Sequence, residues 1–127
     1  MKKHDRDEAG LTAAQRDSLE AALKAEAHQV AQRRRARLKA VVEAPTGGDE
    51  GDEASRLDAE ELAVTLAESE RLTLLKIDAA LQRLARGEYG LDVETGEPIG
   101  YERLKVVPWA TRAAHQEERN ERARRAA

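Results

Sequence analysis

The sequence predicts a mainly α-helical protein, in which a long antiparallel coiled-coil hairpin is followed by a small globular region and a C-terminal helix. Charged residues make up 37% of the chain and hydrophobic residues 40%, the latter mostly alanine and leucine, as in long exposed helices. Two long stretches repeat apolar residues at three- and four-residue steps, and a turn with proline and glycine separates them. All three aromatic residues fall between Tyr89 and Trp109, so the predicted compact core is small and lies there.

The first helix is predicted from Thr12 to about Glu43. Thr12 and Gln15 have the spacing of a capping box, in which the two side chains accept hydrogen bonds from free amides at a helix start. No residue from there to Glu43 breaks a helix. The apolar positions follow three- and four-residue spacing closely and are Leu19, Leu23, Val30, Leu38 and Val41.

Residues 1–11 precede this helix and are expected to be flexible. The segment is charged and contains no apolar run, so it is predicted to be neither a signal peptide nor a membrane span. A cytoplasmic location, with no membrane partner, is therefore the expectation.

A tip is predicted at residues 45–55. Pro45, Gly47 and Gly48 end the first helix, because proline cannot continue the hydrogen-bond ladder and glycine permits a reversal. An acidic turn follows at once, Asp49–Ala54. Its carboxylates suit the positive end of the next helix dipole. Four residues are candidate N-caps for that helix, namely Asp49, Asp52, Ser55 and Asp58.

The second helix is predicted to run to about Arg86, with Gly87 as its C-terminal stop. Its apolar residues form a heptad seam with a polar gap at Glu70, and they are Leu62, Leu66, Leu74, Ile77, Leu81 and Leu84. The first helix is the partner of matching length in the chain. Residues 12–87 are therefore expected to form an antiparallel helical hairpin.

The character of the sequence changes after Gly87. Two short β-type pieces, Tyr89–Leu91 and Pro98–Tyr101, flank a Thr95-Gly96 turn, which predicts a small β-hairpin within a globular region at 88–110. The C-terminal segment 111–127 is predicted to hold a third helix, to about Arg122, and a charged tail.

Composition excludes several kinds of site and partner. The chain has no cysteine, which rules out disulfides, thiolate zinc sites and cysteine nucleophiles. No Ser/His/Asp arrangement or phosphate-binding glycine loop is present in the sequence, so an enzyme is not expected. Direct DNA binding is not expected either, because the basic block on the first helix lacks interleaved aromatic residues and a DNA-binding context. That block consists of Arg33, Arg34, Arg35, Arg37 and Lys39.

The window from Tyr89 to Pro108 resembles the C-terminal zinc-finger region of the TraR/DksA family. In that family an aromatic-Gly pair leads into Cys-x-x-Cys-Gly, then Ile-Gly, Arg-Leu and Pro, and a second Cys-x-x-Cys follows. The matching residues here are Tyr89-Gly90, Gly96, Ile99-Gly100, Arg103-Leu104 and Pro108.

The four positions that hold cysteine in the family hold Asp92, Thr95, Ala113 and Gln116 in this chain. Alanine offers no ligand, and threonine and glutamine are poor ligands for zinc. His115 stands beside one of these positions and is expected to be a surface residue. The resemblance therefore implies a degenerate zinc-finger-like region without zinc or another cofactor, held together by the packing of apolar side chains.

The tip carries a second point of resemblance. The family has Asp-x-x-Asp-x-Ala at the end of its coiled coil, and this chain has Asp49, Asp52 and Ala54 at those positions, at the family's distance from Tyr89-Gly90. The resemblance implies a regulator of bacterial transcription initiation that binds RNA polymerase and inserts this tip through the secondary channel. The two aspartates would bring negative charge near a magnesium-containing site, and small Ala54 would allow close approach.

Some members of the family respond to ppGpp, in the stringent response, through a basic cluster. Lys76 matches one basic position of that cluster. Val107 and Glu117 stand where the ppGpp-responsive type carries arginine and lysine, and a carboxylate repels a polyphosphate. Weak or absent ppGpp binding is the expectation, with Lys76 as a remnant of the site.

Two alternatives remain open from the sequence. One is an antagonist that occupies the polymerase channel without the regulatory effect. The other is a structural coiled-coil protein without polymerase activity, which self-associates through the Leu72 and Leu75 side of the second helix. Under the polymerase hypothesis the chain is expected to be a monomer.

Overall fold

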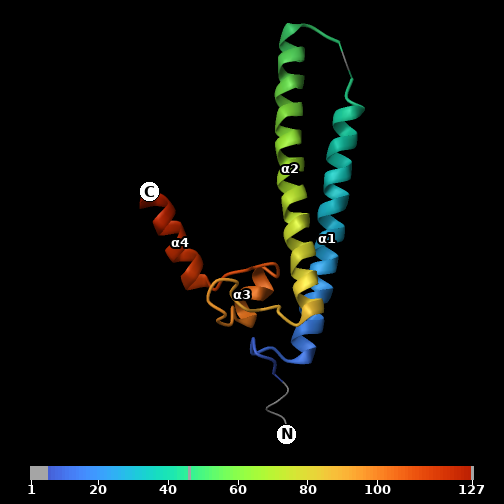
Figure 1. Cartoon of the computed structure of the whole chain (residues 1–127). Helices are drawn as coiled ribbons and strands as arrows, with labels where there is room; N and C mark the ends of the chain where they lie inside the picture. Colours follow the sequence, from blue (N-terminus) through green and yellow to red (C-terminus); the bar gives the residue numbers. More distant parts are fainter. Residues whose placement is uncertain (1–5, 46, 127) are drawn as a thin grey trace. The chain divides into compact units, whose positions relative to one another are not determined.

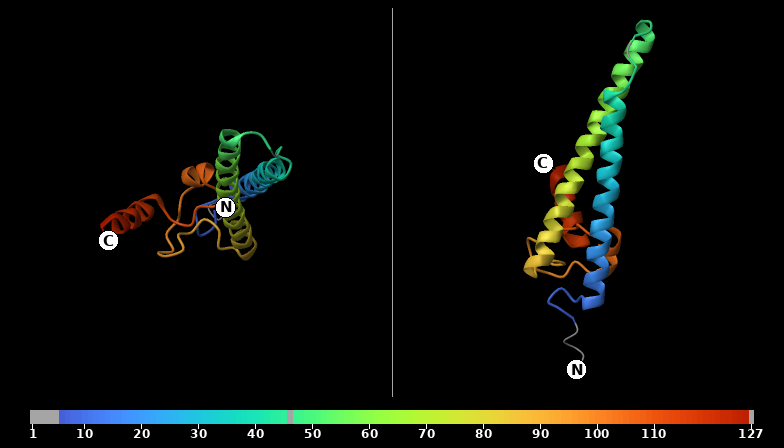
Figure 2. Two further views of the ribbon diagram at one scale, coloured as in Figure 1. Left: turned by 90° about the horizontal axis from the view of Figure 1, so that it is seen from above. Right: turned by 90° about the vertical axis from the view of Figure 1, so that its right-hand side faces the viewer.

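The computed structural model describes residues 6–45 and 47–126, which contain four helices (Figure 1). The chain divides into two compact units, residues 26–76 and the remaining residues on either side of that span. Within residues 26–76, two helices lie side by side and antiparallel, which confirms the predicted helical hairpin (Figures 1 and 2). The helices are α1 (Ala13–Val42), α2 (Glu50–Arg86), α3 (Tyr101–Val106) and α4 (Ala114–Ala126).

The start of α1 confirms the predicted capping box. The backbone N–H of Thr12 donates to Oε1 of Gln15 (3.0 Å), and the backbone N–H of Gln15 donates to Oγ1 of Thr12 (3.1 Å). Two amides that the helix start leaves without a backbone partner are satisfied in this way. The helix therefore begins where its local sequence signal places it.

The seam of α2 departs from the predicted one only before Glu70, since the predicted member Leu74 is half-buried. Leu62 and Leu66 were predicted to lie in the seam, but they are 60% and 37% exposed. Glu70, the predicted polar interruption, is half-buried and occupies a position of the seam. Counting back from Glu70 in steps of three and four gives Ala67, which is buried, and Ala63, which is half-buried.

Side chains of α1 satisfy this polar part of the seam. The Arg37 guanidinium donates from Nε (3.2 Å) and Nη2 (3.0 Å) to the two carboxylate oxygens of Glu70. Nearby, Nε of Arg34 donates to the backbone oxygen of Ala67 (3.1 Å). The hydrogen bonds from Arg37 lower the pKa of the Glu70 carboxyl, and Arg33 and Arg34 lower it further. A two-pronged ion pair thus joins the helices at the polar position that interrupts the predicted apolar seam.

The other unit joins the start of α1 and the end of α2 to the segment that follows Gly87. Its largest fully buried side chains include Leu11, Leu23, Ile77 and Leu104. Ala9 and Leu11 are buried in this core, so residues 6–11 are held in place, in contrast to the flexibility expected for residues 1–11. They form a turn in which the N–H of Asp7 donates to the oxygen of Leu11 (2.9 Å). The remaining part of that segment, residues 1–5, lies outside the described residues.

The predicted β-hairpin is reduced, in the described part of the chain, to one bridge between Leu91 and Pro98. Its turn is present, because the N–H of Gly96 donates to the oxygen of Asp92 (2.9 Å). Tyr101 was predicted to end the second β-type piece and instead begins α3. Gly100 precedes α3 with a φ of 102°, a left-handed conformation that favours glycine and redirects the chain at this point.

The C-terminal helix differs from the prediction at both ends. Helix α4 begins at Ala114 instead of Thr111 and continues to Ala126 instead of Arg122, and Ala127 lies outside the described residues. None of its side chains is buried. Among the described residues, no helix combines the length and the apolar character that crossing a membrane requires.

Candidate functional site

The acidic tip belongs to the unit formed by residues 26–76. The sequence places Asp52 and Ala54 in a turn, but α2 already begins at Glu50, so both residues lie in the first turns of the helix. Both are exposed. Thr46, which falls within the predicted tip at 45–55, lies outside the described residues. The acidic side chains are therefore held by a helix and not by an irregular loop.

Asp49 is the N-cap of α2. Its Oδ1 accepts a hydrogen bond from the N–H of Asp52 (2.9 Å), and its backbone oxygen accepts one from the N–H of Glu53 (3.0 Å). Among the four candidate caps it is the one that stands directly before the first helical residue. Its negative charge also lies at the positive end of the helix dipole. Asp49 thus fixes the start of the helix that carries Asp52.

Arg56 engages the carboxylates next to Asp52. Its guanidinium contacts Glu53, and its Nη1 donates to Oε1 of Glu60 (2.5 Å). The hydrogen bond from Arg56 lowers the pKa of the Glu53 carboxyl. No cation pairs with Asp52 within the described residues. Asp52 is therefore an exposed carboxylate whose backbone is fixed and whose charge is available to a partner.

The roles of two residues at the tip, Arg56 and Gly48, were not identified from the sequence. Arg56 stands three and four residues from glutamates on one helix, which is a spacing that predicts ion pairs. Gly48 has a φ of 103°, and a Cβ there would lie 3.1 Å from both Cβ and Oδ2 of Asp52. Glycine at this position lets the loop pass the first turn without displacing the Asp52 side chain.

The frame from Tyr89 to Pro108 closes on itself in the other unit. The buried hydroxyl of Tyr89 donates to the backbone oxygen of Pro108 (2.8 Å), which joins the two ends of the frame. The N–H of Ile99 donates to the oxygen of Gly90 (2.8 Å). Arg103, on α3, donates from Nε to the oxygen of Arg112 (3.0 Å). The residues of the sequence pattern are therefore the residues that connect the segments of this unit.

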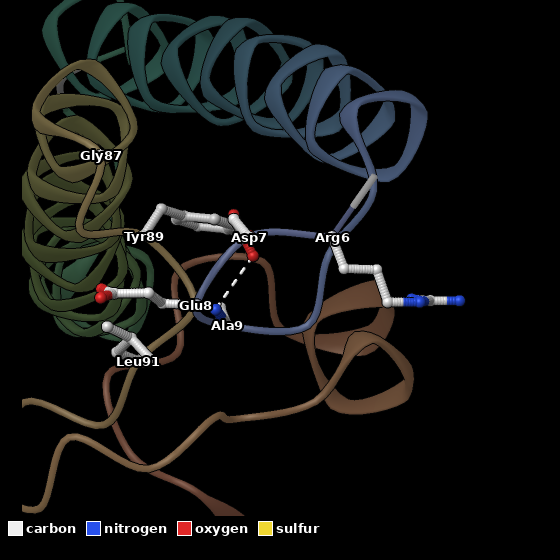
Figure 3. A pocket seen from close by; sticks show the side chains of 7 residues that line it. All are labelled: Arg6, Asp7, Glu8, Ala9, Gly87, Tyr89 and Leu91. Carbon is white, nitrogen blue, oxygen red and sulfur yellow. Dashed lines mark hydrogen bonds between the residues drawn. The ribbon is translucent and has the colours of Figure 1, made fainter. Parts of the chain in front are cut away.

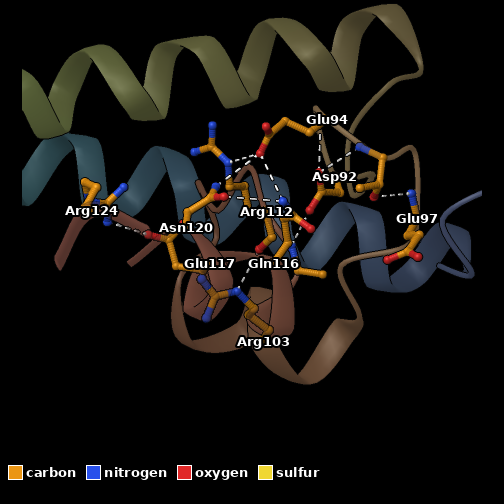
Figure 4. Close-up of polar contacts among 11 residues, drawn as sticks. Asp92, Glu94, Glu97, Arg103, Arg112, Gln116, Glu117, Asn120 and Arg124 are labelled. Atoms are coloured by element: carbon orange, nitrogen blue, oxygen red, sulfur yellow. Dashed lines mark hydrogen bonds and ion pairs between the residues drawn. The ribbon is translucent and has the colours of Figure 1, made fainter. Parts of the chain in front are cut away.

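Hydrogen bonds link the four degenerate ligand positions, of which Figure 4 labels Asp92 and Gln116. Asp92 is 2% exposed. Its Oδ1 accepts from the N–H groups of Glu94 (2.8 Å) and Thr95 (3.0 Å), and its Oδ2 accepts from the N–H of Ala113 (2.8 Å). Burial alone would raise the pKa of Asp92, but these hydrogen bonds and nearby Arg112 bring the pKa below its usual value. Gln116, the fourth position, lies 3.5 Å from Oε1 of Glu94 through its Nε2.

These residues do not fit a zinc ion. Both oxygens of Asp92 already accept hydrogen bonds from the backbone. Ala113 has no ligand atom, and thiolates are absent from the sequence. The parts of the chain that the structure describes contain no group of three or more His, Asp or Glu side chains suited to holding a metal ion. His115 is exposed and pairs with Glu97 (2.9 Å), in agreement with the expected surface position.

A shallow hollow of about 560 Å³ lies beside Tyr89, between the N-terminal turn and the segment after α2 (Figure 3). Asp7 lines it, but its Oδ1 accepts from the N–H groups of Ala9 and Leu11 (both 2.9 Å), and its Oδ2 accepts from Arg16 (2.9 Å). The carboxylate of Asp7 is thus committed to holding the turn. The side chains that line the hollow form no arrangement typical of catalysis and are Arg6, Asp7, Glu8, Ala9, Tyr89 and Leu91.

The positions related to ppGpp divide between the two units. Lys76 is exposed at the end of the unit formed by residues 26–76. Val107 and Glu117 belong to the other unit, where both are half-buried. Glu117 lies 3.7 Å from the Arg124 guanidinium, so this carboxylate has a cation of its own.

Comparison with known proteins finds relatives that match parts of the chain. No family model matches it. It is 42% identical over 77 residues to the RNA polymerase-binding transcription factor DksA of Caulobacter vibrioides, and the match covers 61% of this chain and 54% of that relative. It is 44% identical over 46 residues to general stress protein 16O of Bacillus subtilis, or 36% of this chain and 28% of that relative. The chain thus spans about half the length, or less, of these relatives.

The solved structure of the transcription factor DksA2 from Pseudomonas aeruginosa is similar over most of both chains. The TM-score is 0.80 at 38% sequence identity, and the match covers 89% of this chain and 88% of that chain.

Proposed function

Because the chain belongs to the TraR/DksA family, we propose that it binds RNA polymerase and regulates the initiation of bacterial transcription. The proposal rests above all on the similarity to DksA2 over 88% of that chain at 38% identity. It is supported by the DksA relative, whose name describes a factor that binds this polymerase. A role in the stringent response follows from the same family relationship.

The acidic tip is the part that we propose acts on the polymerase, by entering the secondary channel towards the active centre. Asp49 holds the start of α2, and Asp52 carries an exposed charge with no cation beside it in the described residues. Ala54 is exposed and small, so it leaves room for a surface to approach the first turns of the helix. The factor contributes charge and shape at this site and catalyses no reaction itself.

The tip proposal predicts that Asp52→Asn abolishes the effect on transcription and leaves polymerase binding intact. The substitution removes one charge with almost no change in size, and within the described residues the side chain of Asp52 makes none of the hydrogen bonds that hold the helix start. Transcription from a ribosomal promoter in vitro measures the effect, and co-purification with core polymerase measures binding. Asp58→Asn is the matched control, because Asp58 is an exposed aspartate further along the same helix.

Asp49→Asn removes the negative charge of Asp49 but keeps a good helix cap, because asparagine also caps helices well. It therefore tests the charge of Asp49 separately from its capping. If the chain with Asp52→Asn still regulates transcription fully, the tip proposal is wrong. If the native chain does not co-purify with polymerase, the proposed function as a whole is wrong.

We also propose that ppGpp does not bind this chain strongly. Lys76 is the one basic residue at the compared positions, where Val107 is uncharged and Glu117 is negative. Isothermal titration of ppGpp into the complex with polymerase is expected to give the same heat with the native chain as with Lys76→Ala. Micromolar binding that disappears in Lys76→Ala would refute this prediction, and Lys24→Ala, at an exposed lysine of α1, controls for the loss of a positive charge.

One observation favours a second function, self-association. Leu72 and Leu75 are 45% and 53% exposed on α2, and exposed apolar side chains at helical spacing can pack against another helix. Sedimentation of the purified chain distinguishes the two. A monomer that co-purifies with polymerase supports the proposed function, and a stable dimer without affinity for polymerase supports the structural alternative.

A further inference from the structure

We infer that two carboxylates, Asp92 and Glu94, replace the metal centre of the zinc-finger-like region and connect the same four positions by hydrogen bonds. Both carboxylates and their partners lie within one unit of the structure, so the inference does not depend on the proposed function. The family resemblance implies a zinc site at these positions, and the residues that are present do not fit zinc.

Asp92 connects two segments that are far apart in the sequence. Its carboxylate accepts hydrogen bonds from the N–H groups of Thr95 (3.0 Å), in its own turn, and Ala113 (2.8 Å), 21 residues later. Those two residues stand at two of the other three degenerate ligand positions. The N–H of Val93 also donates to the oxygen of Thr111 (2.8 Å), so backbone and side-chain bonds join the same two segments. The carboxylate is 2% exposed, where hydrogen bonds to a charged acceptor are strong.

Glu94 connects the turn to α4. Its Oε1 accepts from Nε of Arg112 (2.8 Å) and from Nδ2 of Asn120 (3.1 Å), and Nε2 of Gln116, the fourth degenerate position, approaches it at 3.5 Å. These contacts lower the pKa of the Glu94 carboxyl, with Arg112 as the largest cause. Figure 4 shows the side chains of Arg112, Gln116 and Asn120 directed towards Glu94. The first turns of α4, which has no buried side chain, are held here.

The arrangement reverses the charges of a zinc finger. In a structural zinc site, negative thiolates converge on one cation. In this chain, backbone N–H groups, side-chain amides and the Arg112 guanidinium converge on two anions. All four degenerate positions take part, because Asp92 accepts the bonds, Thr95 and Ala113 donate their backbone N–H groups and Gln116 turns its amide to Glu94. Ala113 needs no side-chain ligand atom here, because it takes part through its backbone N–H.

Asp92→Asn tests the inference, because asparagine has nearly the same shape but has one acceptor oxygen instead of two. Either the N–H of Ala113 or the N–H groups of Glu94 and Thr95 must then face an amide donor. We expect the melting midpoint of the full chain to fall by on the order of 10 °C. Asp78→Asn is the matched control, since Asp78 is an exposed aspartate on the α2 part of the same unit, and it should leave the midpoint unchanged.

Amide hydrogen exchange distinguishes a local effect, because general destabilisation would accelerate exchange throughout the unit and not at selected residues. In the milder variant Glu94→Gln, we expect the N–H groups of Gln116 and Asn120 to exchange faster by roughly tenfold, while that of Ala113 keeps its protection. In Asp92→Asn the amides of Thr95 and Ala113 are expected to lose protection ahead of the rest of the unit. Unchanged melting and exchange in both variants would overturn the inference.

Introducing cysteine at all four degenerate ligand positions tests directly whether these positions converge as they do in a zinc site. The chain with Asp92→Cys, Thr95→Cys, Ala113→Cys and Gln116→Cys combined is expected to bind zinc stoichiometrically and to require it for its melting midpoint. A chelator is expected to leave the midpoint of the native chain unchanged. Failure of the four-cysteine chain to bind zinc would show that these positions do not converge as a metal site does.

Discussion

Gly90→Ala is expected to have the largest effect on stability of any conservative substitution in the chain. Gly90 has a φ of +91°, and a Cβ there would lie 2.8 Å from Cβ of Ala9 and 3.1 Å from Cδ1 of Leu11. The left-handed backbone costs about 1–2 kcal/mol for a residue other than glycine, and overpacking a core typically costs about 1–3 kcal/mol. Together they amount to roughly 2–5 kcal/mol, measured by chemical denaturation.

Two further variants separate the causes of this effect. Gly96→Ala introduces the same methyl group at a φ of +77° with nothing within 4 Å, so it reports the backbone cost alone. Adding Ala9→Gly to Gly90→Ala removes the atom that the new Cβ would strike and is expected to restore part of the stability. If Gly96→Ala costs as much as Gly90→Ala, the packing of the N-terminal turn against Gly90 contributes nothing.

The second large effect is a loss of stability at alkaline pH that depends on Tyr89. Burial raises the pKa of Tyr89 to about 12, although nearby Arg83 acts in the opposite direction. The unfolded chain releases this proton at a pH of about 10. Stability is therefore complete below a pH of about 10 and falls as the pH rises towards 12, by on the order of 3 kcal/mol in total.

Denaturant unfolding across this pH range measures the Tyr89 effect. Tyr89→Phe is expected to be less stable at neutral pH by about 1 kcal/mol, since it loses the hydrogen bond to the Pro108 oxygen. The same variant should lose much of the alkaline dependence, while Tyr101→Phe, at a half-buried tyrosine, should retain it. An equally steep alkaline loss in Tyr89→Phe would exclude Tyr89 as its source.

The parts of the fold that depend on local signals could be predicted from the sequence. The capping box of Thr12 and Gln15 and the stop at Gly87 each involve residues within one helical turn, and both helix ends lie where those residues place them. The part of the seam before Glu70 could not be predicted in the same way. Leucines and alanines on α2 both repeat at heptad spacing, and which set faces α1 depends on the partner helix and on the pairing of Glu70 with Arg37.

Short elements that are stabilised by tertiary contacts could not be predicted from the sequence either. Helix α3 has six residues, too few for intrinsic propensity to stabilise it, and it depends on Gly100 and on the burial of Leu104. The role of Asp92 was missed for a related reason. Judged as a metal ligand it is a poor substitute for cysteine, and its bond to the N–H of Ala113 exists only once the chain has brought the two residues together.

The ion pair between Arg37 and Glu70 has a consequence for the choice among alternative pairings of α1 and α2. Apolar heptad seams can slip by seven residues and still bury leucine and alanine against each other. A slip of that size would set Arg37 opposite Ala63 or Ile77 and leave a guanidinium and a carboxylate without partners in the seam. The pair therefore selects one alignment of the helices, and with it the length of loop that precedes Asp49, even where the apolar residues around it do not discriminate.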